Sequence, residues 1–220
     1  MHPPIPEITA DGSATLYLPN MDEHYHSVKG AVGEARHVYL ETALHASTAS
    51  PVRVLEIGFG TGLNAFLTAL DTRHGGRPVI YTALERYPLP WETAAALRYP
   101  EHIDPQQAPL FRQLHEAAWN RPVALTPGFT LRKVEADLTR YRFTDTFDVV
   151  YFDAFAPDKQ PEMWDEEIFV RIAAALAPGG VLGTYCAKGE VRRRLQRAGF
   201  TVERLPGPVG GKREILRARI

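Results

Sequence analysis

Glycines at positions 58, 60 and 62 follow a short apolar run, and this stretch is suited to holding a nucleotide-like ligand. The run, residues 52–57, is typical of a strand buried on both faces, and an amphipathic helix is expected from Leu63. Glycine lets the backbone approach a ligand, and a helix start offers free N–H groups. Glu56 stands just before the first glycine. Its negative charge is unfavourable beside a pyrophosphate and favours a ligand that carries an ammonium group.

The glycine spacing argues against a dinucleotide. A G-x-G-x-x-G fingerprint needs its third glycine at position 63, which is Leu63. E-x-G-x-G-x-G after a buried strand instead resembles the first motif of the seven-strand S-adenosylmethionine (AdoMet) methyltransferases, and the alternative is a glycine turn without a ligand. The resemblance implies these cofactor-binding residues: Glu56, Gly58, Phe59, Gly60, Thr61, Gly62 and Asn64.

Two further acids are expected at the ends of neighbouring strands. Glu85 ends the apolar segment 78–85, and a carboxylate there accepts hydrogen bonds from both ribose hydroxyls in many nucleoside-binding sheets. Asp137 ends the segment 129–137, where it is placed to meet an adenine amino group. The alternative for Glu85 is an ordinary exposed charge. We therefore predict that both residues contact AdoMet.

The loop D-A-F-A-P, residues 153–157, leaves the carboxyl end of a fourth strand. Methyl transfer from a sulfonium to an amine requires a neutral amine whose lone pair faces the methyl group. Asp153 is predicted to accept a hydrogen bond from that amine and to act as the catalytic residue, while Phe155 stacks on a flat substrate. This loop resembles the acidic or amide loop of amine-directed methyltransferases. Asp153 capping the loop, or binding only the AdoMet ammonium, is the alternative.

These residues require strands that alternate with helices. Besides the segments above, strands are expected at 145–155 and 179–187, helices at 63–70, 91–97, 162–176 and 188–198, and an antiparallel pair at 200–205 and 213–220. This order predicts an α/β protein with a doubly wound seven-strand sheet, a Rossmann-like AdoMet-dependent methyltransferase fold with a terminal antiparallel pair.

The chain is predicted to divide near residue 50. Residues 1–50 contain a hairpin at 7–18 that turns at Asp11-Gly12, and a helix from Ala31 that packs beside the core. Residues 51–220 form the methyltransferase domain. A helical segment bracketed by prolines, at about 100–128, is expected as an insertion.

Composition fits a globular protein of the cytoplasm. The 220 residues carry a net charge of −1, and the sequence shows neither a transmembrane-length apolar stretch nor a signal peptide. Cys186 is the single cysteine, which excludes an internal disulfide framework. The histidines clustered between positions 24 and 45 lack a recognised ligand spacing, so no metal is expected.

Charge is distributed unevenly along the chain. Residues 186–220 hold ten Lys/Arg against three Asp/Glu, a balance of +7, whereas residues 1–185 hold fifteen against twenty-three, a balance of −8. A basic end of this kind fits a nucleic-acid contact or a solvated surface. On the first reading Arg193, Arg194, Lys212 and Arg213 contact RNA phosphates.

Several motifs in one order resemble an MnmC-like methyltransferase, the part of a bifunctional enzyme that finishes 5-methylaminomethyl-2-thiouridine at the tRNA wobble position. They are H-Y-H-S (24–27), G-A-V-G-E-A-R-H-V-Y-L (30–40), L-E-I-G-F-G-T-G-L-N (55–64), E-R-Y-P-L (85–89), D-A-F-A-P (153–157), P-E-M-W (161–164), G-E-V-R-R-R-L (189–195) with A-G-F (198–200), and G-G-K-R-E (210–214). One departure is Gln160, where the family pattern has Asn.

The resemblance implies an enzyme that transfers a methyl group from AdoMet to the exocyclic amine of 5-aminomethyl-(2-thio)uridine in tRNA. It resembles the stand-alone form, without a flavin-dependent oxidoreductase half. Further substrate contacts are predicted from Tyr25, His26, Pro157 and Trp164, although Trp164 also suits packing of the loop onto the core. The alternatives are a small-molecule amine N-methyltransferase or aminopropyltransferase of the same fold, and a non-catalytic AdoMet-binding RNA protein.

Overall fold

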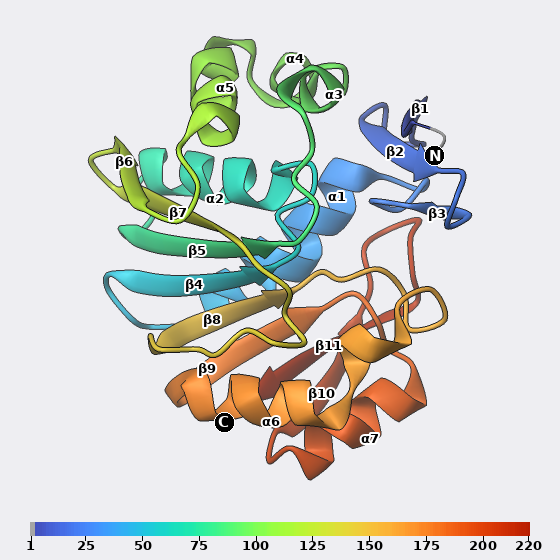
Figure 1. Cartoon of the computed structure of the whole chain (residues 1–220), viewed down its shortest axis with the longest axis vertical. Helices are drawn as coiled ribbons and strands as arrows, with labels where there is room; N and C mark the ends of the chain where they lie inside the picture. Colours follow the sequence, from blue (N-terminus) through green and yellow to red (C-terminus); the bar gives the residue numbers. More distant parts are fainter. Residues whose placement is uncertain (1–2) are drawn as a thin grey trace.

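The computed structural model describes residues 3–220, in which one eight-stranded sheet has the order β10–β11–β9–β8–β4–β5–β7–β6 (Figure 1). The strands are β4 (Val52–Ile57), β5 (Val79–Glu85), β6 (Pro122–Thr126), β7 (Phe129–Glu135), β8 (Phe147–Phe152), β9 (Leu176–Thr184), β10 (Thr201–Pro206) and β11 (Glu214–Arg219). Strands β9, β8, β4, β5 and β7 are parallel. The chain moves outward from β4 through β5 to β7 and then returns to β8 on the other side of β4. The carboxyl end of β4 is therefore the point where ligands bind in such sheets.

The predicted doubly wound sheet and its terminal antiparallel pair are confirmed, with one strand added. Strand β6 lies antiparallel to β7 at the edge of the sheet, within a stretch for which only helix was predicted. Pro122 begins β6, and an edge is where proline is tolerated because one side of the strand needs no ladder partner. Prolines on both sides of a segment indicate breaks around a helix, and for this reason the edge strand was not predicted.

Helices cover both faces of the sheet (Figure 1). One side carries α1 (Ala31–Ala35), the π-helix η1 (Arg36–Glu41), η2 (Leu44–Ala46), α2 (Leu63–Arg73), α3 (Trp91–Ala95), α4 (Tyr99–Ile103), η3 (Pro105–Gln107) and α5 (Ala108–Glu116). The other carries η4 (Pro161–Trp164), α6 (Glu166–Ala175) and α7 (Gly189–Arg197). Side chains along β8 alternate between the two faces of the sheet. Val149 and Tyr151 pack in the core under the first group of helices, and Val150 and Phe152 pack in the core under the second group.

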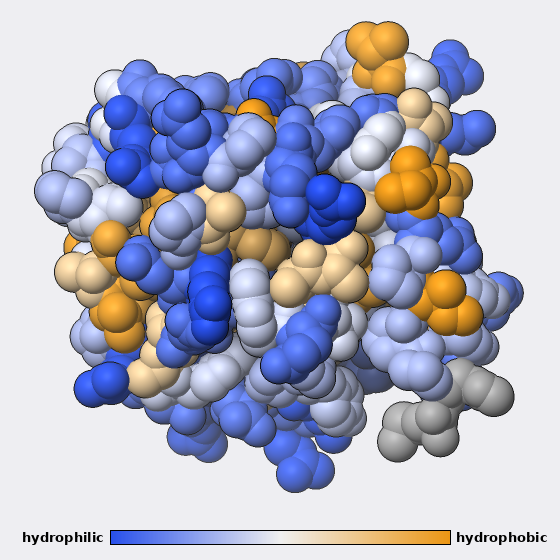
Figure 2. Space-filling view, turned by 90° about the horizontal axis from the view of Figure 1, so that it is seen from above, coloured by the Kyte–Doolittle hydropathy of each residue, from blue (hydrophilic) through white to orange (hydrophobic). Residues whose placement is uncertain are grey.

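A small sheet of β1 (Ile5–Ile8), β2 (Ala14–Leu18) and β3 (Glu23–His24) precedes these elements. The hairpin turn at Asp11-Gly12 is present, and it anchors α1, because Ser13 Oγ accepts from Ala31 N (3.1 Å) and Asp11 Oδ2 accepts from Gly33 N (3.0 Å). Seen from above, the surface is mostly hydrophilic, with hydrophobic groups scattered at its sides (Figure 2). Ile8 of β1 is 77% exposed. The division of the chain at residue 50 stays a prediction, and residues 1–2 lie outside the described part.

Across residues 3–220, no helix is both long and apolar enough to cross a membrane. Within the same residues no group of three or more His, Cys, Asp or Glu side chains is arranged to hold a metal ion.

Gly183 of β9 allows η1 to lie directly on the sheet, which gives a stability prediction. A Cβ atom at position 183 would lie 2.9 Å from Ala43 Cβ and 3.1 Å from the carbonyl oxygen of Val38. Gly183→Ala should lower the free energy of unfolding by about 1–3 kcal/mol, because η1 must shift away from the strand. Urea denaturation measures this.

Gly128→Ala is the matched control, because a Cβ there would meet its nearest neighbour, Thr72 Cβ, at an ordinary 3.5 Å. Equal stability of the two variants would show that η1 has room to relax.

Candidate functional site

A pocket of about 370 Å³ opens at the carboxyl edge of the parallel strands. Most of the predicted site residues line it: Tyr25, His26, Gly58, Phe59, Gly60, Thr61, Asn64, Glu85, Asp137, Asp153, Phe155 and Lys212. They come from the ends of β4, β5, β7 and β8, from the segment after β3 and from the loop before β11. Segments far apart in the sequence thus meet at one edge because the strands are parallel.

The glycine loop is shaped by close contacts that exclude side chains. Gly58 has φ +88°, and a Cβ atom there would lie 3.0 Å from the carbonyl oxygen of Asp153. Gly60 has φ +49°, and its Cβ would lie 3.2 Å from the ring of Tyr25. A larger residue would therefore be strained at either position and would push apart the two walls of the pocket.

Glu85 is fixed at the tip of β5 by two backbone amides. Gly60 N donates to Oε2 at 2.9 Å, and Tyr87 N donates to Oε1 at 2.8 Å. Each carboxylate oxygen keeps a further lone pair, so the side chain can still accept from a ligand. Glu85 thus links the glycine loop to β5 and presents an anchored acceptor to the pocket.

Glu56 lies beneath the pocket rather than in its lining. Its side chain is fully buried (0% exposed), and neither carboxylate oxygen makes a hydrogen bond of ordinary geometry within residues 3–220, although Asn64 and Tyr81 lie close enough to lower its pKa. Burial, and then the charge of Asp153, raise the pKa of Glu56 well above its usual value. A buried carboxylate without a hydrogen bond of ordinary geometry fits a site that receives a cationic group, and so the residues present are compatible with AdoMet.

Asp137 is held in an Asx turn beside the pocket. Thr139 donates to Oδ1 through its hydroxyl (2.7 Å) and its backbone N–H (2.9 Å), and Arg86 pairs with Oδ2 at 3.0 Å. The Thr139 hydroxyl contributes most to lowering the pKa of Asp137. Asp137 is therefore an ionised acceptor whose two oxygens already have partners.

Asp153 is held by two side-chain donors, one on each carboxylate oxygen. Tyr39 donates its hydroxyl to Oδ1 at 2.6 Å, and Asn64 donates Nδ2 to Oδ2 at 2.8 Å. Burial raises the pKa of Asp153 to about 6, and the two hydrogen bonds oppose that rise. The following loop is also fixed, since Tyr185 donates to the carbonyl of Ala154 at 2.8 Å.

Two residues of the H-Y-H-S segment cover the glycine loop. The ring of Tyr25 meets that of Phe155 edge to face at 5.0 Å between centroids. His26 Nε2 lies 2.7 Å from Thr61 Oγ1, and burial, followed by the charge of Lys212, lowers the pKa of His26 to about 4. His26 is thus a neutral hydrogen-bonding residue at neutral pH. The segment forms a roof over the pocket.

Trp164, Gly62 and Pro157 also do not line the pocket. Trp164 is fully buried (0% exposed) behind the wall, where it packs against Phe152 and its indole N–H donates to the carbonyl of Phe155 at 2.8 Å. Its part in the site is thus to hold the D-A-F-A-P loop. Gly62, with φ +74°, begins α2, and Pro157 follows the part of the loop that faces the pocket.

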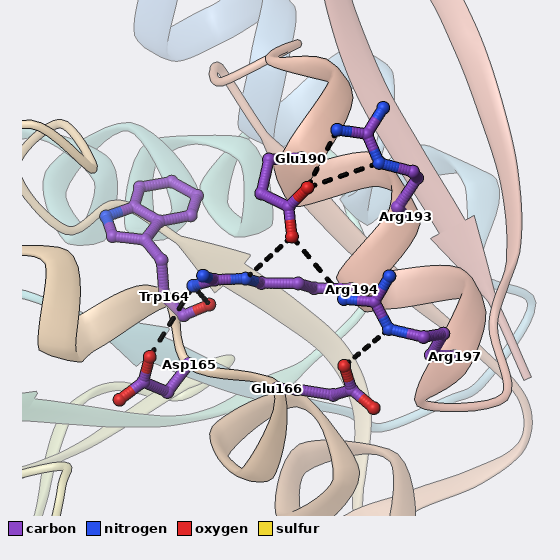
Figure 3. A network of polar contacts seen from close by, with 7 residues as sticks. All are labelled: Trp164, Asp165, Glu166, Glu190, Arg193, Arg194 and Arg197. Atoms are coloured by element: carbon purple, nitrogen blue, oxygen red, sulfur yellow. Dashed lines mark hydrogen bonds and ion pairs between the residues drawn. The ribbon is translucent and has the colours of Figure 1, made fainter.

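The basic helix α7 uses its arginines within the protein (Figure 3). Glu190 accepts from Arg193 Nη2 at 2.7 Å and from Arg194 Nε at 3.3 Å. Arg194 also donates to the carbonyl of Trp164 at 2.9 Å, and Arg197 pairs with α6. Arg193 and Arg194 therefore lie away from the pocket and have acidic partners. Arg213 is exposed, while its neighbour Lys212 reaches the pocket.

Several residues of the site were not among those predicted. Tyr39 contacts Asp153, Glu34 pairs with Lys212 at 2.7 Å, and Tyr185 lines the pocket with Lys212 Nζ 4.1 Å from its ring centre. Tyr185 follows the last residue of β9, so the rule that strand tips carry function would have indicated it. Tyr39 stands within one of the recognised motifs, but its spacing gives no sign of its partner.

Comparison with known proteins identifies the class. Residues 125–220 match the model of a family described as S-adenosyl-L-methionine-dependent methyltransferase. Over 99% of its length the chain superimposes on 70% of the crystal structure of MNMC2 from Aquifex aeolicus, with a TM-score of 0.75 at 23% identity. The chain has the AdoMet-dependent methyltransferase fold. Spermidine synthase from Thermotoga maritima shares this fold at a TM-score of 0.56 and 14% identity.

The chain is also similar in sequence to curated MnmC proteins. The tRNA 5-methylaminomethyl-2-thiouridine biosynthesis bifunctional protein MnmC of Pseudomonas putida (strain F1) is 31% identical over 96% of the chain, and that of Cupriavidus necator is 33% identical over 96%. The chain spans 34% of the length of each. The predicted resemblance to MnmC-like methyltransferases, and AdoMet as the cofactor of this class, are confirmed.

The anchored acid at the tip of β5 gives a binding prediction. Glu85→Ala should weaken AdoMet binding by about 1–3 kcal/mol, because the variant removes hydrogen bonds to a charged acceptor. Isothermal titration calorimetry measures the change.

Glu135→Ala is the matched control, since Glu135 is the exposed register neighbour of Glu85 on β7. The ribose assignment fails if both variants bind AdoMet as tightly as the wild type does, or if NAD binds instead.

Proposed function

We propose that the chain transfers a methyl group from AdoMet to the exocyclic amine of 5-aminomethyl-(2-thio)uridine at the tRNA wobble position, giving 5-methylaminomethyl-(2-thio)uridine. The observation that carries this proposal is Asp153, which is held by Tyr39 and Asn64 at the wall of the pocket, beside the glycine loop. The names of the relatives, which refer to 5-methylaminomethyl-2-thiouridine in tRNA, support the substrate.

For the cofactor we propose contacts along the strand tips. Residues 56–62 would receive the methionine end, Glu85 the ribose hydroxyls and Asp137 the adenine. When bound, AdoMet supplies an electrophilic methyl group on a sulfonium. The anchored carboxylate of Glu85 supplies negative charge at this end of the pocket, and Glu56, whose raised pKa favours its protonated form, would ionise when a cation lies beside it.

For the amine we propose an acceptor pair and two aromatic walls. Asp153 and backbone carbonyls of residues 154–156 accept from the amine N–H groups, so that its lone pair faces the methyl group. Tyr25 and Phe155 lie edge to face at the pocket, where a flat base would stack on one of them. The neutral His26 helps to close the roof.

For tRNA we propose a contact at the rim of the pocket rather than on α7. Three of the four α7 arginines, Arg193, Arg194 and Arg197, are paired with acids, which lowers their value as phosphate contacts. By contrast, Lys29, Arg36 and Arg213 are exposed and have no ion-pair partner among residues 3–220. They belong to two segments that meet, since Lys212 pairs with Glu34 at 2.7 Å. This rim is therefore the best-placed surface for an RNA backbone.

The catalytic proposal is tested by a series at Asp153. Turnover should fall in the order Asp, Asn, Ala, with Asp153→Ala losing about a hundredfold or more, the scale of a positioned proton acceptor. The measurement is single-turnover methyl transfer from labelled AdoMet to tRNA that carries 5-aminomethyl-uridine, with nucleoside analysis of the product.

Asp158→Asn is the control, because Asp158 is exposed on the same loop and pairs with Lys188. Near-normal rates for Asp153→Ala at saturating AdoMet would show that Asp153 does not orient the substrate amine. If the protein methylates small amines and does not methylate tRNA, the proposed tRNA substrate is wrong and a small amine is the substrate.

The rim proposal predicts a change in salt dependence. Lys29→Gln with Arg213→Gln should flatten the logarithmic salt slope of tRNA binding by a little under one unit for each phosphate that the variant no longer neutralises, because fewer counterions are then released on binding. Fluorescence anisotropy at several salt concentrations measures the slope.

The comparison pair is Arg142→Gln with Arg193→Gln, which removes the same charge from the exposed loop before β8 and from α7. If only the comparison pair flattens the salt slope of tRNA binding, the rim proposal is wrong and the surface that includes α7 contacts the RNA.

A further inference from the structure

Asp153 is held by two donors that belong to different parts of the chain. Asn64 lies at the start of α2, directly after the glycine loop, and donates to Oδ2 at 2.8 Å. Tyr39 lies in the π-helix η1, before the first parallel strand, and donates to Oδ1 at 2.6 Å. Asn64 belongs to the predicted cofactor loop, whereas Tyr39 is outside it. The Tyr39 hydroxyl can therefore be altered without changing the glycine loop.

Tyr39 is itself held rigidly. Its side chain is 2% exposed, and its ring packs against that of Tyr151 at 5.2 Å between centroids. π-Helical turns are rare and frequent at functional sites. Here the turn lies against β9 at Gly183, where a Cβ would come within 3.1 Å of the η1 backbone. Burial, and then the charge of Asp153, raise the pKa of Tyr39 well above its usual value, so its hydroxyl keeps the proton that it donates.

We propose that Tyr39 is a positioning residue of the methyl-transfer site, whose hydroxyl fixes the Asp153 carboxylate as an ionised acceptor aimed at the substrate amine. This inference rests on the proposed function. With Oδ1 bound by Tyr39 and Oδ2 by Asn64, the plane of the carboxylate is set, and each oxygen keeps a lone pair for the amine. Tyr39 acts through Asp153 and not on the substrate itself.

The hydrogen bond also affects where Asp153 titrates. Burial raises the pKa of Asp153 to about 6, the bonds from Tyr39 and then Asn64 lower it, Glu34 raises it and Lys212 lowers it. Other ionisable groups whose charge couples to Asp153 are Glu56, Tyr81, Tyr99 and Tyr185. Removal of the Tyr39 bond takes away the largest lowering influence, so the pKa of Asp153 moves further upward.

The test is Tyr39→Phe, which removes one hydroxyl and keeps the ring. The acid limb of the single-turnover rate, measured at saturating AdoMet and tRNA, should move upward by about one pH unit, because the carboxylate no longer receives this hydrogen bond. The fall in rate should be larger at pH 6 than at pH 8.5. Replacement of Tyr39 by 3-fluorotyrosine, a stronger donor of the same shape, should move the limb to lower pH.

Tyr151→Phe is the matched control, because Tyr151 is buried against the same ring but its hydroxyl lies 3.2 Å from Thr68 Oγ1 instead. It should leave the limb in place. An unmoved limb in Tyr39→Phe, or an equal shift in Tyr151→Phe, would overturn the proposal.

A second readout separates this inference from the proposed function. The carboxyl resonance of Asp153 in ¹³C-aspartate-labelled protein, assigned by its absence in Asp153→Asn, reports the titration directly. Its midpoint should rise in Tyr39→Phe even if tRNA is not the substrate. Absence of methyl transfer by the wild type would therefore refute the function alone, whereas an unshifted carboxyl midpoint would refute the role of Tyr39.

Discussion

Burial of negative charge at one edge of the sheet is the constraint on which the rest of the site depends. Glu56 lies fully buried below the pocket, and Asp153 and Glu85 stand at its walls. Burial, and then the charge of Asp153, raise the pKa of Glu56, and burial raises that of Asp153, so the ionised forms of these two groups are destabilised. Donors hold Asp153 and Glu85, whereas Glu56 makes no hydrogen bond of ordinary geometry among residues 3–220. An edge built in this way is completed by a cation.

The sequence was sufficient for the sheet and for placing most of the predicted cofactor residues at one pocket, because both depend on local patterns. The apolar run of β4, the three glycines and the acid at the tip of β5 follow one another in chain order, and together they favour one arrangement of strand, turn and strand tip. The parallel arrangement then places the carboxyl ends together, which brought Glu85 and Asp153 correctly to one pocket. Strand β6 was missed because its prolines suggested a break rather than an edge.

Contacts between distant segments were beyond prediction. Tyr39 and Asp153 meet only because η1 packs on β9 at Gly183, a fit that no single stretch encodes. The arginines of α7 are a second example of contacts between distant segments that the sequence does not reveal. The RNA contact that their number suggests stays a prediction, but Arg193, Arg194 and Arg197 have acidic partners, and counting charges along the chain does not reveal such pairing.

The roof formed by Tyr25 and His26 is linked to the proposed RNA contact. It belongs to the segment that precedes Lys29 and is joined through Glu34 to Lys212, so the cover of the cofactor pocket and the proposed RNA rim are one connected piece. A nucleic acid bound at this rim would contact the segment that covers the pocket. The cover of the pocket and the proposed RNA contact therefore depend on the same ion pair, between Glu34 and Lys212.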